Sequence, residues 1–372
     1  MPTFAKQVPW PRDPHTAAKH AIYRRYLDRW WPILIRGYSG DATYAEGFAG
    51  PGVYDQGESG SPVIALEALL ARKELRNLVK RARLLFVDAD ERCTGLLARQ
   101  LQAVLPRTPL TVLRDDYNVD VRVELGSCEP TLENLLDASG AWGHPMLVVL
   151  DTFGGAVPAR LLQRVAANVA SEVLVTIQPQ YFLRFAGADA DVTDGDEVFG
   201  SATWRQVVHQ PSAGKARWLM QQYRQTVVAS GFSHVLDFEL IDARGQLLYL
   251  VFGTTHQRGL EKMKEVMWEV DEATGIRYRD PRDPGQQALE IELEPQTAPL
   301  RRQVLAYLQT QPGHQCSVGD VREFALFHTV YKAAQVRPVL TLMRDSGEIG
   351  SDTTSYLRSE SEVWLVPSAG PR

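Results

Sequence analysis

The chain has 372 residues, of which 44% are hydrophobic and 23% are charged, and its formal net charge is −5 at pH 7. This length allows two domains, and the composition is that of an ordinary globular protein rather than of a disordered or fibrous one. The negative balance gives no global argument for binding nucleic acid, and no apolar run approaches the roughly 20 residues that span a bilayer.

Cysteine usage and the first residues indicate the compartment. Cys93, Cys128 and Cys316 lie far apart and lack the spacing of metal ligands. They are typical of reduced thiols, and the first two are expected to be packing residues. The amino-terminal segment has early prolines and no apolar core of signal length. We therefore expect a cytoplasmic protein with no metal site and no membrane contact.

Residues 1–40 are predicted to form an extended arm and then a helix. The apolar residues of this helix share one face by their spacing: Ile22, Tyr26, Trp30 and Ile33. Residues 1–36 contain seven Lys and Arg against two Asp and Glu. This basic balance fits a face for nucleic acid or another polyanion, but an ordinary solvated helix face is the favoured interpretation.

Residues 41–276 alternate short apolar runs with helical patterns, which predicts one α/β domain. The predicted strands are short, largely apolar runs at 43–48, 84–87, 110–113, 146–150 and 173–177. Such runs are buried on both faces, as in a parallel sheet covered by helices, and the β–α alternation favours a doubly wound fold. A helix at 215–230 and a hairpin of strands at 235–241 and 247–254 complete a predicted sheet of seven strands.

Acidic residues stand at the carboxyl ends of four predicted strands. They are Glu46, Asp88, Asp115 or Asp116, and Asp151. Ligands of doubly wound sheets bind at this edge, so the acids are expected to converge on one site. The turn Gly47-Phe48-Ala49-Gly50-Pro51-Gly52 after Glu46 allows a ligand to approach the backbone. The structural alternative is that Asp88 and Asp151 cap the amino ends of helices.

The last part of the chain is predicted to be a separate domain. Residues 277–297 are rich in Arg, Asp, Pro and Gly and are expected to be a linker. Residues 298–368 contain three helical patterns and then two short strands, which suggests a winged helix. Residues 290–372 carry eight Lys and Arg against ten Asp and Glu. This balance favours contact with protein, or packing, slightly over the reading of DNA bases.

Residues 15–275 resemble the three-Cys-motif partner proteins (TcmP), a bacterial group. The matching segments are Lys19-His20 with Tyr26-Leu27, Phe48 to Gly52 with Tyr54, Gly60-Ser61-Pro62, the Asp151 turn, Phe199-Gly200 with Trp204, and Tyr249 to Trp268. The resemblance implies a Rossmann-like class I methyltransferase that uses S-adenosylmethionine (SAM). It also implies a partner protein that bears a three-cysteine motif, of the kind that holds an iron–sulfur cluster.

The resemblance also implies roles for the residues at the strand ends. Glu46, Phe48, Ala49, Gly50, Pro51 and Gly52 would contact the methionine part of SAM, and Asp88 would accept hydrogen bonds from the ribose hydroxyls. Asp115 or Asp116 would accept from the adenine amine, with Tyr117 on the ring. Asp151 would accept from an exocyclic amine of the target, and Phe153 would stack on a flat base, which predicts N-methylation of a nucleic-acid base.

One departure from the family keeps other functions open. Thr152 stands where the family commonly has a proline, which fixes the backbone φ angle. A methyltransferase-like scaffold without catalytic activity, kept for interaction with the partner, is therefore the main alternative. A dinucleotide or nucleotide-sugar oxidoreductase is a third class, which the closing hairpin disfavours. The sequence leaves DNA, RNA and protein open as substrates.

Overall fold

A computed structural model describes residues 6–152, 157–187, 195–242, 244–279 and 297–366. By their mutual contacts these residues form two compact units, which are described separately below. The first comprises residues 6–262 with 277–279, and the second comprises residues 263–276 with 297–366. Helix α10 (Gln257–Val270) contributes to both units. Most of the predicted linker at 277–297 lies outside the described residues.

The first unit is built on an eight-stranded sheet in the order β3-β2-β1-β4-β5-β7-β6-β8. The strands are β1 (Asp41–Glu46), β2 (Arg81–Asp88), β3 (Val119–Leu125), β4 (Met146–Leu150), β5 (Ser171–Ile177), β6 (His234–Ile241), β7 (Leu247–Thr254) and β8 (Arg277–Arg279). Strands β1 to β5 pair in parallel, and β7 runs antiparallel to both of its neighbours. The doubly wound sheet is confirmed, whereas the predicted strand number of seven is wrong. Strand β8 escaped prediction because its three residues, Arg-Tyr-Arg, form no apolar run.

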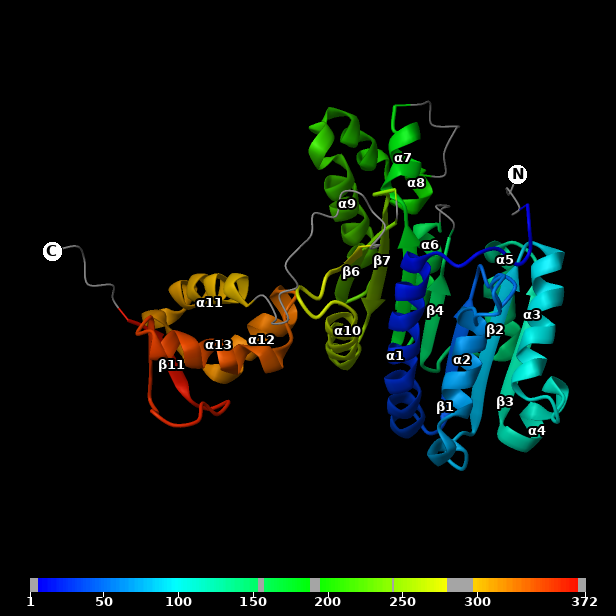
Figure 1. Ribbon diagram of the computed structural model, residues 1–372, viewed down its shortest axis with the longest axis horizontal. Helices are drawn as coiled ribbons and strands as arrows, with labels where there is room; N and C mark the ends of the chain where they lie inside the picture. Colours follow the sequence, from blue (N-terminus) through cyan, green and yellow to red (C-terminus); the bar gives the residue numbers. More distant parts are fainter. Residues whose placement is uncertain (1–5, 153–156, 188–194, 243, 280–296, 367–372) are drawn as a thin grey trace. The chain divides into compact units, whose positions relative to one another are not determined.

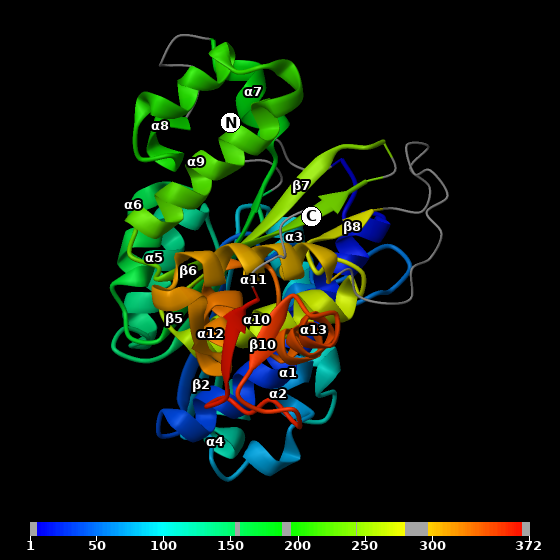
Figure 2. The same ribbon diagram turned by 90° about the vertical axis from the view of Figure 1, so that its left-hand side faces the viewer.

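Helices cover both faces of this sheet (Figures 1 and 2). Their bounds are α1 (Pro14–Gly37), α2 (Ser61–Leu70), α3 (Glu91–Val104), α4 (Leu113–Tyr117), α5 (Cys128–Ser139), α6 (Ala159–Ala166), α7 (Pro179–Phe185), α8 (Gly195–Val198) and α9 (Lys215–Ala229). Helices α5, α6 and α9 share one core with the strands. Helices α1, α2 and α3 pack in sequence on the other face. Every residue of the central strand β4 is buried, as its unbroken apolar run requires.

The third predicted strand is wrong. Residues 110–113 form a 3₁₀ turn and the start of α4, and the strand lies further on, at Val119–Leu125. Strand β3 is at the edge of the sheet, and only its first two residues are buried. Its sequence therefore alternates apolar residues with charged ones, Asp120, Arg122 and Glu124, and lacks the apolar run that marks the central strands. The apolar run at 110–113 was therefore mistaken for the strand.

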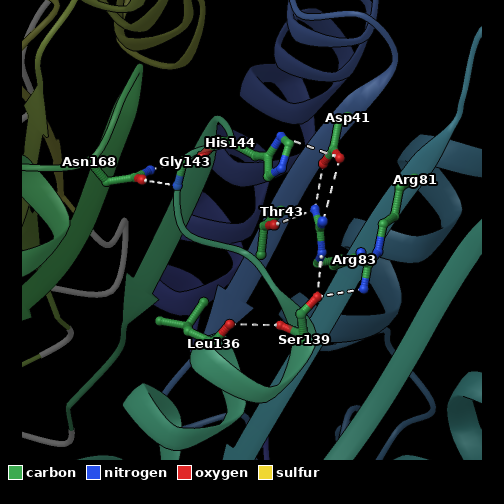
Figure 3. A network of polar contacts seen from close by, with 9 residues as sticks. All are labelled: Asp41, Thr43, Arg81, Arg83, Leu136, Ser139, Gly143, His144 and Asn168. Carbon is green, nitrogen blue, oxygen red and sulfur yellow. Dashed lines mark hydrogen bonds and ion pairs between the residues drawn. The ribbon is translucent and has the colours of Figure 1, made fainter.

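A buried polar network joins strands and helices at the amino end of the sheet (Figure 3). Arg83 of β2 has no solvent exposure, and its guanidinium forms an ion pair with Asp41 of β1. The Arg83 Nε also donates to the carbonyl of Ser139 at the end of α5 (3.0 Å). Asp41 also has a second neighbour, His144, whose Nδ1 lies 3.3 Å from Oδ2. These contacts connect β1, β2 and α5 at the amino end of the sheet, opposite to the predicted site.

The second unit contains three helices and a small antiparallel sheet. The elements are α11 (Ala298–Thr310), β9 (Gln315–Ser317), α12 (Val318–His328), α13 (Ala333–Asp345), β10 (Ile349–Ser351) and β11 (Glu362–Leu365), with the strand order β10-β11-β9. The predicted helices and the last two strands are confirmed, and β9 is an addition. The winged-helix assignment stays a prediction. The buried Lys264 of α10 donates to four backbone carbonyls of this unit, those of Ala325, Leu326, Thr329 and Tyr331.

The cysteines are buried free thiols, as expected for packing residues. Within the described part of the chain, no group of His, Cys, Asp and Glu is arranged to hold a metal ion. The helices of that part also include none that is long and apolar enough to cross a membrane.

Candidate functional site at the carboxyl edge of the sheet

The glycine-rich turn after β1 lies across the ends of the neighbouring strands. The Gly47 N–H donates to Val149 of β4 (3.1 Å), and the Ala49 N–H donates to Val87 of β2 (3.0 Å). Gly50 and Gly52 have φ angles of 63° and 73°, which side chains other than glycine rarely adopt. The turn therefore has the conformation that the sequence predicted, with its backbone at the carboxyl edge of three strands.

Asp88 at the end of β2 faces this turn. Its Oδ2 accepts the N–H of Gly50 (2.8 Å), and its Oδ1 accepts the N–H of Asp90 (2.9 Å). Burial raises the pKa of Asp88 above its usual value, although the two backbone bonds oppose this shift. Each oxygen keeps one lone pair for another donor. The carboxylate is thus fixed by the backbone and can still accept from the two hydroxyls of a sugar.

Glu46 lies beneath the turn and faces inward. It is 1% exposed, and its two oxygens accept hydrogen bonds from Tyr44 Oη (2.6 Å) and Ser61 Oγ (2.8 Å). Burial raises its pKa to about 8, against the effect of these hydroxyls. Both oxygens are therefore already bonded within the chain, and Glu46 supports the turn from below.

Replacing Glu46 with glutamine is expected to remove one component of the pH dependence of stability. A carboxyl whose pKa rises from 4.5 to about 8 on folding binds more protons in the folded state between these values. The free energy of unfolding of the wild type must then fall as pH rises through this window, on the order of a few kcal/mol in all. Glutamine does not titrate, so the free energy of unfolding of the variant should rise relative to that of the wild type as pH rises.

The measurement is urea unfolding of both proteins at pH 5.5 and pH 9. Other titrating groups are common to the two proteins and cancel in the difference, including Glu172, whose pKa burial raises to about 7. A difference in unfolding free energy that is the same at both pH values would contradict the prediction.

Asp151 at the end of β4 is bound by two donors of the chain. Lys19 of α1 forms an ion pair with its Oδ2, and Thr176 Oγ1 donates to its Oδ1 (2.8 Å). The Lys19 side chain is 6% exposed and that of Asp151 is 20% exposed. Burial opposes ionisation of Asp151, yet the Lys19 ammonium and the Thr176 hydroxyl outweigh it and hold its pKa below the usual value. Asp151 is therefore an ionised carboxylate with a cation beside it.

Thr152 is fixed by a reciprocal pair of hydrogen bonds with Thr176 at the end of β5. The Thr152 hydroxyl donates to the carbonyl of Thr176 (3.0 Å), and the single proton of the Thr176 hydroxyl is shared between the carbonyl of Thr152 (3.0 Å) and Asp151 Oδ1. Thr152 is 2% exposed. Hydroxyl bonds across two neighbouring strands thus hold this backbone in the absence of a proline ring. The next predicted residue, Phe153, lies outside the described residues.

An aromatic residue of the amino-terminal arm covers the turn, which the sequence analysis did not predict. The carbonyl of Trp10 accepts the N–H of Asp55 (3.1 Å), and the Trp10 ring packs edge-on against Tyr54. A methyl group at Gly50 would lie 3.5 Å from the Trp10 ring. Trp10, the residues from Phe48 to Tyr54 and Asp151 line one pocket. The sequence signal that could have indicated this contact is the tryptophan itself, which stands in an otherwise polar, Pro-rich arm.

Lys19 and His20 form one of the segments by which the sequence resembles the TcmP family. The structure places both against the site: His20 is 4% exposed, and its Nε2 lies 3.4 Å from Tyr54 Oη. Burial lowers the pKa of His20 to about 3, so its imidazole is neutral. Lys19 is therefore the cation nearest to Asp151 that the described residues bring to this edge.

The predicted adenine-binding residues lie at the wrong end of the sheet. Asp115, Asp116 and Tyr117 belong to α4 and precede β3, so they stand at its amino end. In the register of the sheet, Val119 pairs with Ala82 and Leu125 with Asp88. The intervening strand is about 20 Å long. Tyr117 instead packs under the guanidinium of Arg76, 4.5 Å from the ring centroid. The error follows directly from the misplaced third strand.

The strand order β3-β2-β1-β4-β5-β7-β6, with β7 reversed, defines the Rossmann-like class I methyltransferase fold, to which β8 is added. No known family model matches the chain. No curated protein matches it either.

Several solved structures resemble the chain at low identity. Trm1 from Pyrococcus horikoshii, solved with S-adenosyl-L-methionine, is 10% identical, with coverage of 71% of this chain and 61% of that chain and a TM-score of 0.37. A putative O-methyltransferase from Klebsiella pneumoniae is 13% identical over 66% of this chain and 92% of that chain, with a TM-score of 0.31. Spermidine synthase from Thermotoga maritima is 9% identical over 66% of this chain and 61% of that chain, with a TM-score of 0.32.

Proposed function

We propose that this protein is a SAM-dependent methyltransferase of the cytoplasm that methylates an amino group on a nucleic-acid base. The observation that carries the proposal is the convergence of the Gly50 turn, Asp88 and Asp151 at one edge of the sheet. This edge belongs to adjacent strands and is where doubly wound sheets bind ligands. We further propose that the protein acts with a partner that bears the three-cysteine motif, as the resemblance implies.

SAM would lie along the turn with its ribose at Asp88. The carboxylate would accept from both ribose hydroxyls with the lone pairs that Gly50 and Asp90 leave unused. The backbone of the turn would hold the methionine part, with Glu46 supporting the turn from below. The adenine contact has to come from the true end of β3, around Leu125, which lies beside Asp88 in the sheet.

Methyl transfer requires the amine nitrogen in line with the sulfonium methyl at near-attack distance. Asp151 orients the amine by accepting one of its N–H groups, since two of its lone pairs remain beyond the bonds from Lys19 and Thr176. The nitrogen lone pair forms the new C–N bond, and the electrons of the C–S bond stay on sulfur. The proton then leaves the methylated nitrogen to Asp151 or to water.

Lys19 is expected to keep Asp151 ionised for this role. In a Lys19→Met variant the buried carboxylate loses its cation, so its pKa rises and the active, ionised form requires a higher pH. We expect methyl transfer at pH 7 to fall by about 100-fold or more, while SAM affinity changes little. The measurement is the rate of transfer from labelled SAM across a pH series.

Lys19→Arg is the matched variant, because it keeps the charge and should keep the acid limb of the pH profile near that of the wild type. An acid limb in the same place in Lys19→Met would show that Lys19 does not tune Asp151. A purely structural lysine would lower the rate without moving that limb.

A non-catalytic scaffold is the second candidate, and the bonds that occupy Asp151 and Thr152 favour it. Calorimetric titration of the folded protein with SAM separates the two functions. No heat above background would remove the methyltransferase proposal. If SAM binds, incubation with labelled SAM and total nucleic acid, followed by digestion to nucleosides, identifies the methylated base. A labelled protein fraction in place of nucleosides would overturn the base as substrate.

A further inference from the structure

A second cavity lies at the amino end of the sheet, away from the glycine turn. It holds about 140 Å³ and is lined by α1, by the start of β5 and by the first turns of α10. The lining residues within the first unit include Tyr26, Trp30, Tyr38, Glu172, Arg258 and Lys262. Glu172 is the second residue of β5, whereas Thr176 of the methyltransferase site stands near the end of the same strand. The two sites are thus at opposite edges of the sheet.

A carboxyl group forms the inner wall of this cavity. Glu172 is 6% exposed and accepts hydrogen bonds from Tyr26 Oη (2.7 Å) and Thr254 Oγ1 (3.1 Å). A methyl group at Gly259 would lie 2.1 Å from Glu172 Oε1, so only glycine lets α10 approach the carboxyl this closely. Burial raises the pKa of Glu172 to about 7, which leaves a large share of the group uncharged at neutral pH.

The cavity also contains a hydrogen-bond donor without an ordinary partner. Trp30 is 3% exposed, and within the described part of the chain its indole Nε1 has no partner at normal hydrogen-bond geometry, although it lies near Glu172. The indole N–H is thus only weakly engaged with Glu172, and a ligand acceptor at normal distance and angle would form the stronger hydrogen bond. The Trp30 ring supplies in addition a flat apolar wall.

Cationic side chains stand at the mouth of the cavity. Arg258 and Lys262 are one turn apart on α10 and both line the cavity, as does His256 just before the helix. Arg258 and His256 are exposed, so the Arg258 guanidinium lies on the solvent side of the cavity. The interior is therefore aromatic with one donor and one carboxyl, and the entrance favours an anion.

We propose that this cavity binds a small molecule that consists of a single planar aromatic ring with an acidic substituent, that is, an aromatic monocarboxylate. A cavity of about 150 Å³ holds one benzene-sized ring, which sets the size of the ligand. The ring packs against Trp30 and Tyr26. An acceptor atom on its inner edge takes the indole N–H, and its carboxylate faces Arg258 and Lys262 at the mouth.

The test uses the full-length protein and three probes of one shape and different charge: nicotinate, nicotinamide and 3-picolylamine. Calorimetry at pH 6.5 should show binding of nicotinate at least about tenfold tighter than that of nicotinamide, because only the acid gains charge-assisted bonds at the mouth. Nicotinate binding should weaken as pH rises through 7, since ionised Glu172 repels the acid, and Glu172→Gln should remove this dependence. Tighter binding of the picolylamine cation, or no binding of nicotinate at millimolar concentration, would overturn the proposal.

Variants of residues inside and outside the cavity test where the ligand binds. Arg258→Gln should weaken nicotinate about tenfold and leave nicotinamide unchanged, whereas Arg217→Gln on α9 removes the same charge from a residue outside the cavity and should change neither. Trp30→Phe keeps an aromatic wall without the N–H and should weaken both ring probes. Circular dichroism spectra and urea unfolding midpoints that match those of the wild type report correct folding of all these variants. Equal nicotinate affinity in Arg258→Gln and Arg217→Gln would contradict the assignment of the mouth.

Discussion

Replacing Asp88 with alanine is expected to lower SAM affinity by about 100-fold or more. The variant removes the carboxylate that the backbone of Gly50 and Asp90 fixes and that is proposed to bind the ribose. Two hydrogen bonds to a charged group contribute about 1.5–3 kcal/mol each, and each 1.4 kcal/mol is a factor of ten in affinity. Calorimetric titration of wild type and variant with SAM, or with its demethylated product, measures the change directly.

Asp115→Ala is the matched control for this experiment. Asp115 was predicted from the sequence to hold adenine, but the structure places it before β3, at the opposite edge of the sheet. We therefore expect unchanged SAM affinity in Asp115→Ala. A loss in Asp115→Ala together with unchanged affinity in Asp88→Ala would show that the cofactor binds at the other end of the sheet.

Replacing Asp41 with asparagine is expected to destabilise the first unit by about 3–5 kcal/mol, because it leaves the buried guanidinium of Arg83 without its counter-charge. Arg83 keeps its bond to the Ser139 carbonyl, but a carbonyl and a hydroxyl do not neutralise a buried charge (Figure 3). Urea unfolding, followed by circular dichroism, gives the loss in unfolding free energy.

Two further variants test the cause of this loss. In Asp41→Asn with Arg83→Met both charges are gone, and part of the stability should return, since buried ion pairs are often replaced by apolar residues without loss. Asp137→Asn removes one partner of the exposed ion pair with Arg164, and it should cost less than about 1 kcal/mol. A double variant less stable than Asp41→Asn would show that the Arg83 side chain stabilises the unit by packing and not through its pair.

Much of the fold could be predicted because its central elements are encoded locally. The fully apolar run at Met146–Leu150 predicts a strand that is buried on both faces, as β4 is. The errors of prediction concern the two outermost strands of the sheet. Strands β3 and β8 meet solvent or end the sheet, so charged residues interrupt their apolar patterns. The misplacement of β3 then moved the predicted adenine site to the wrong end.

The sequence by itself determined the doubly wound class of the sheet and the edge at which Asp88, Asp151 and the Gly50 turn meet, because strand polarity fixes where each carboxyl end lies. Only the tertiary structure decided what these residues contact. Glu46 turns inward to Tyr44 and Ser61, and Lys19 reaches Asp151 across 132 residues of chain. The amino-edge cavity likewise joins Trp30, Glu172 and Arg258 from separate elements. Such pairings depend on how α1 and α10 pack against the sheet. Helical periodicity specifies which face of a helix is apolar, but it does not specify which residues that face packs against.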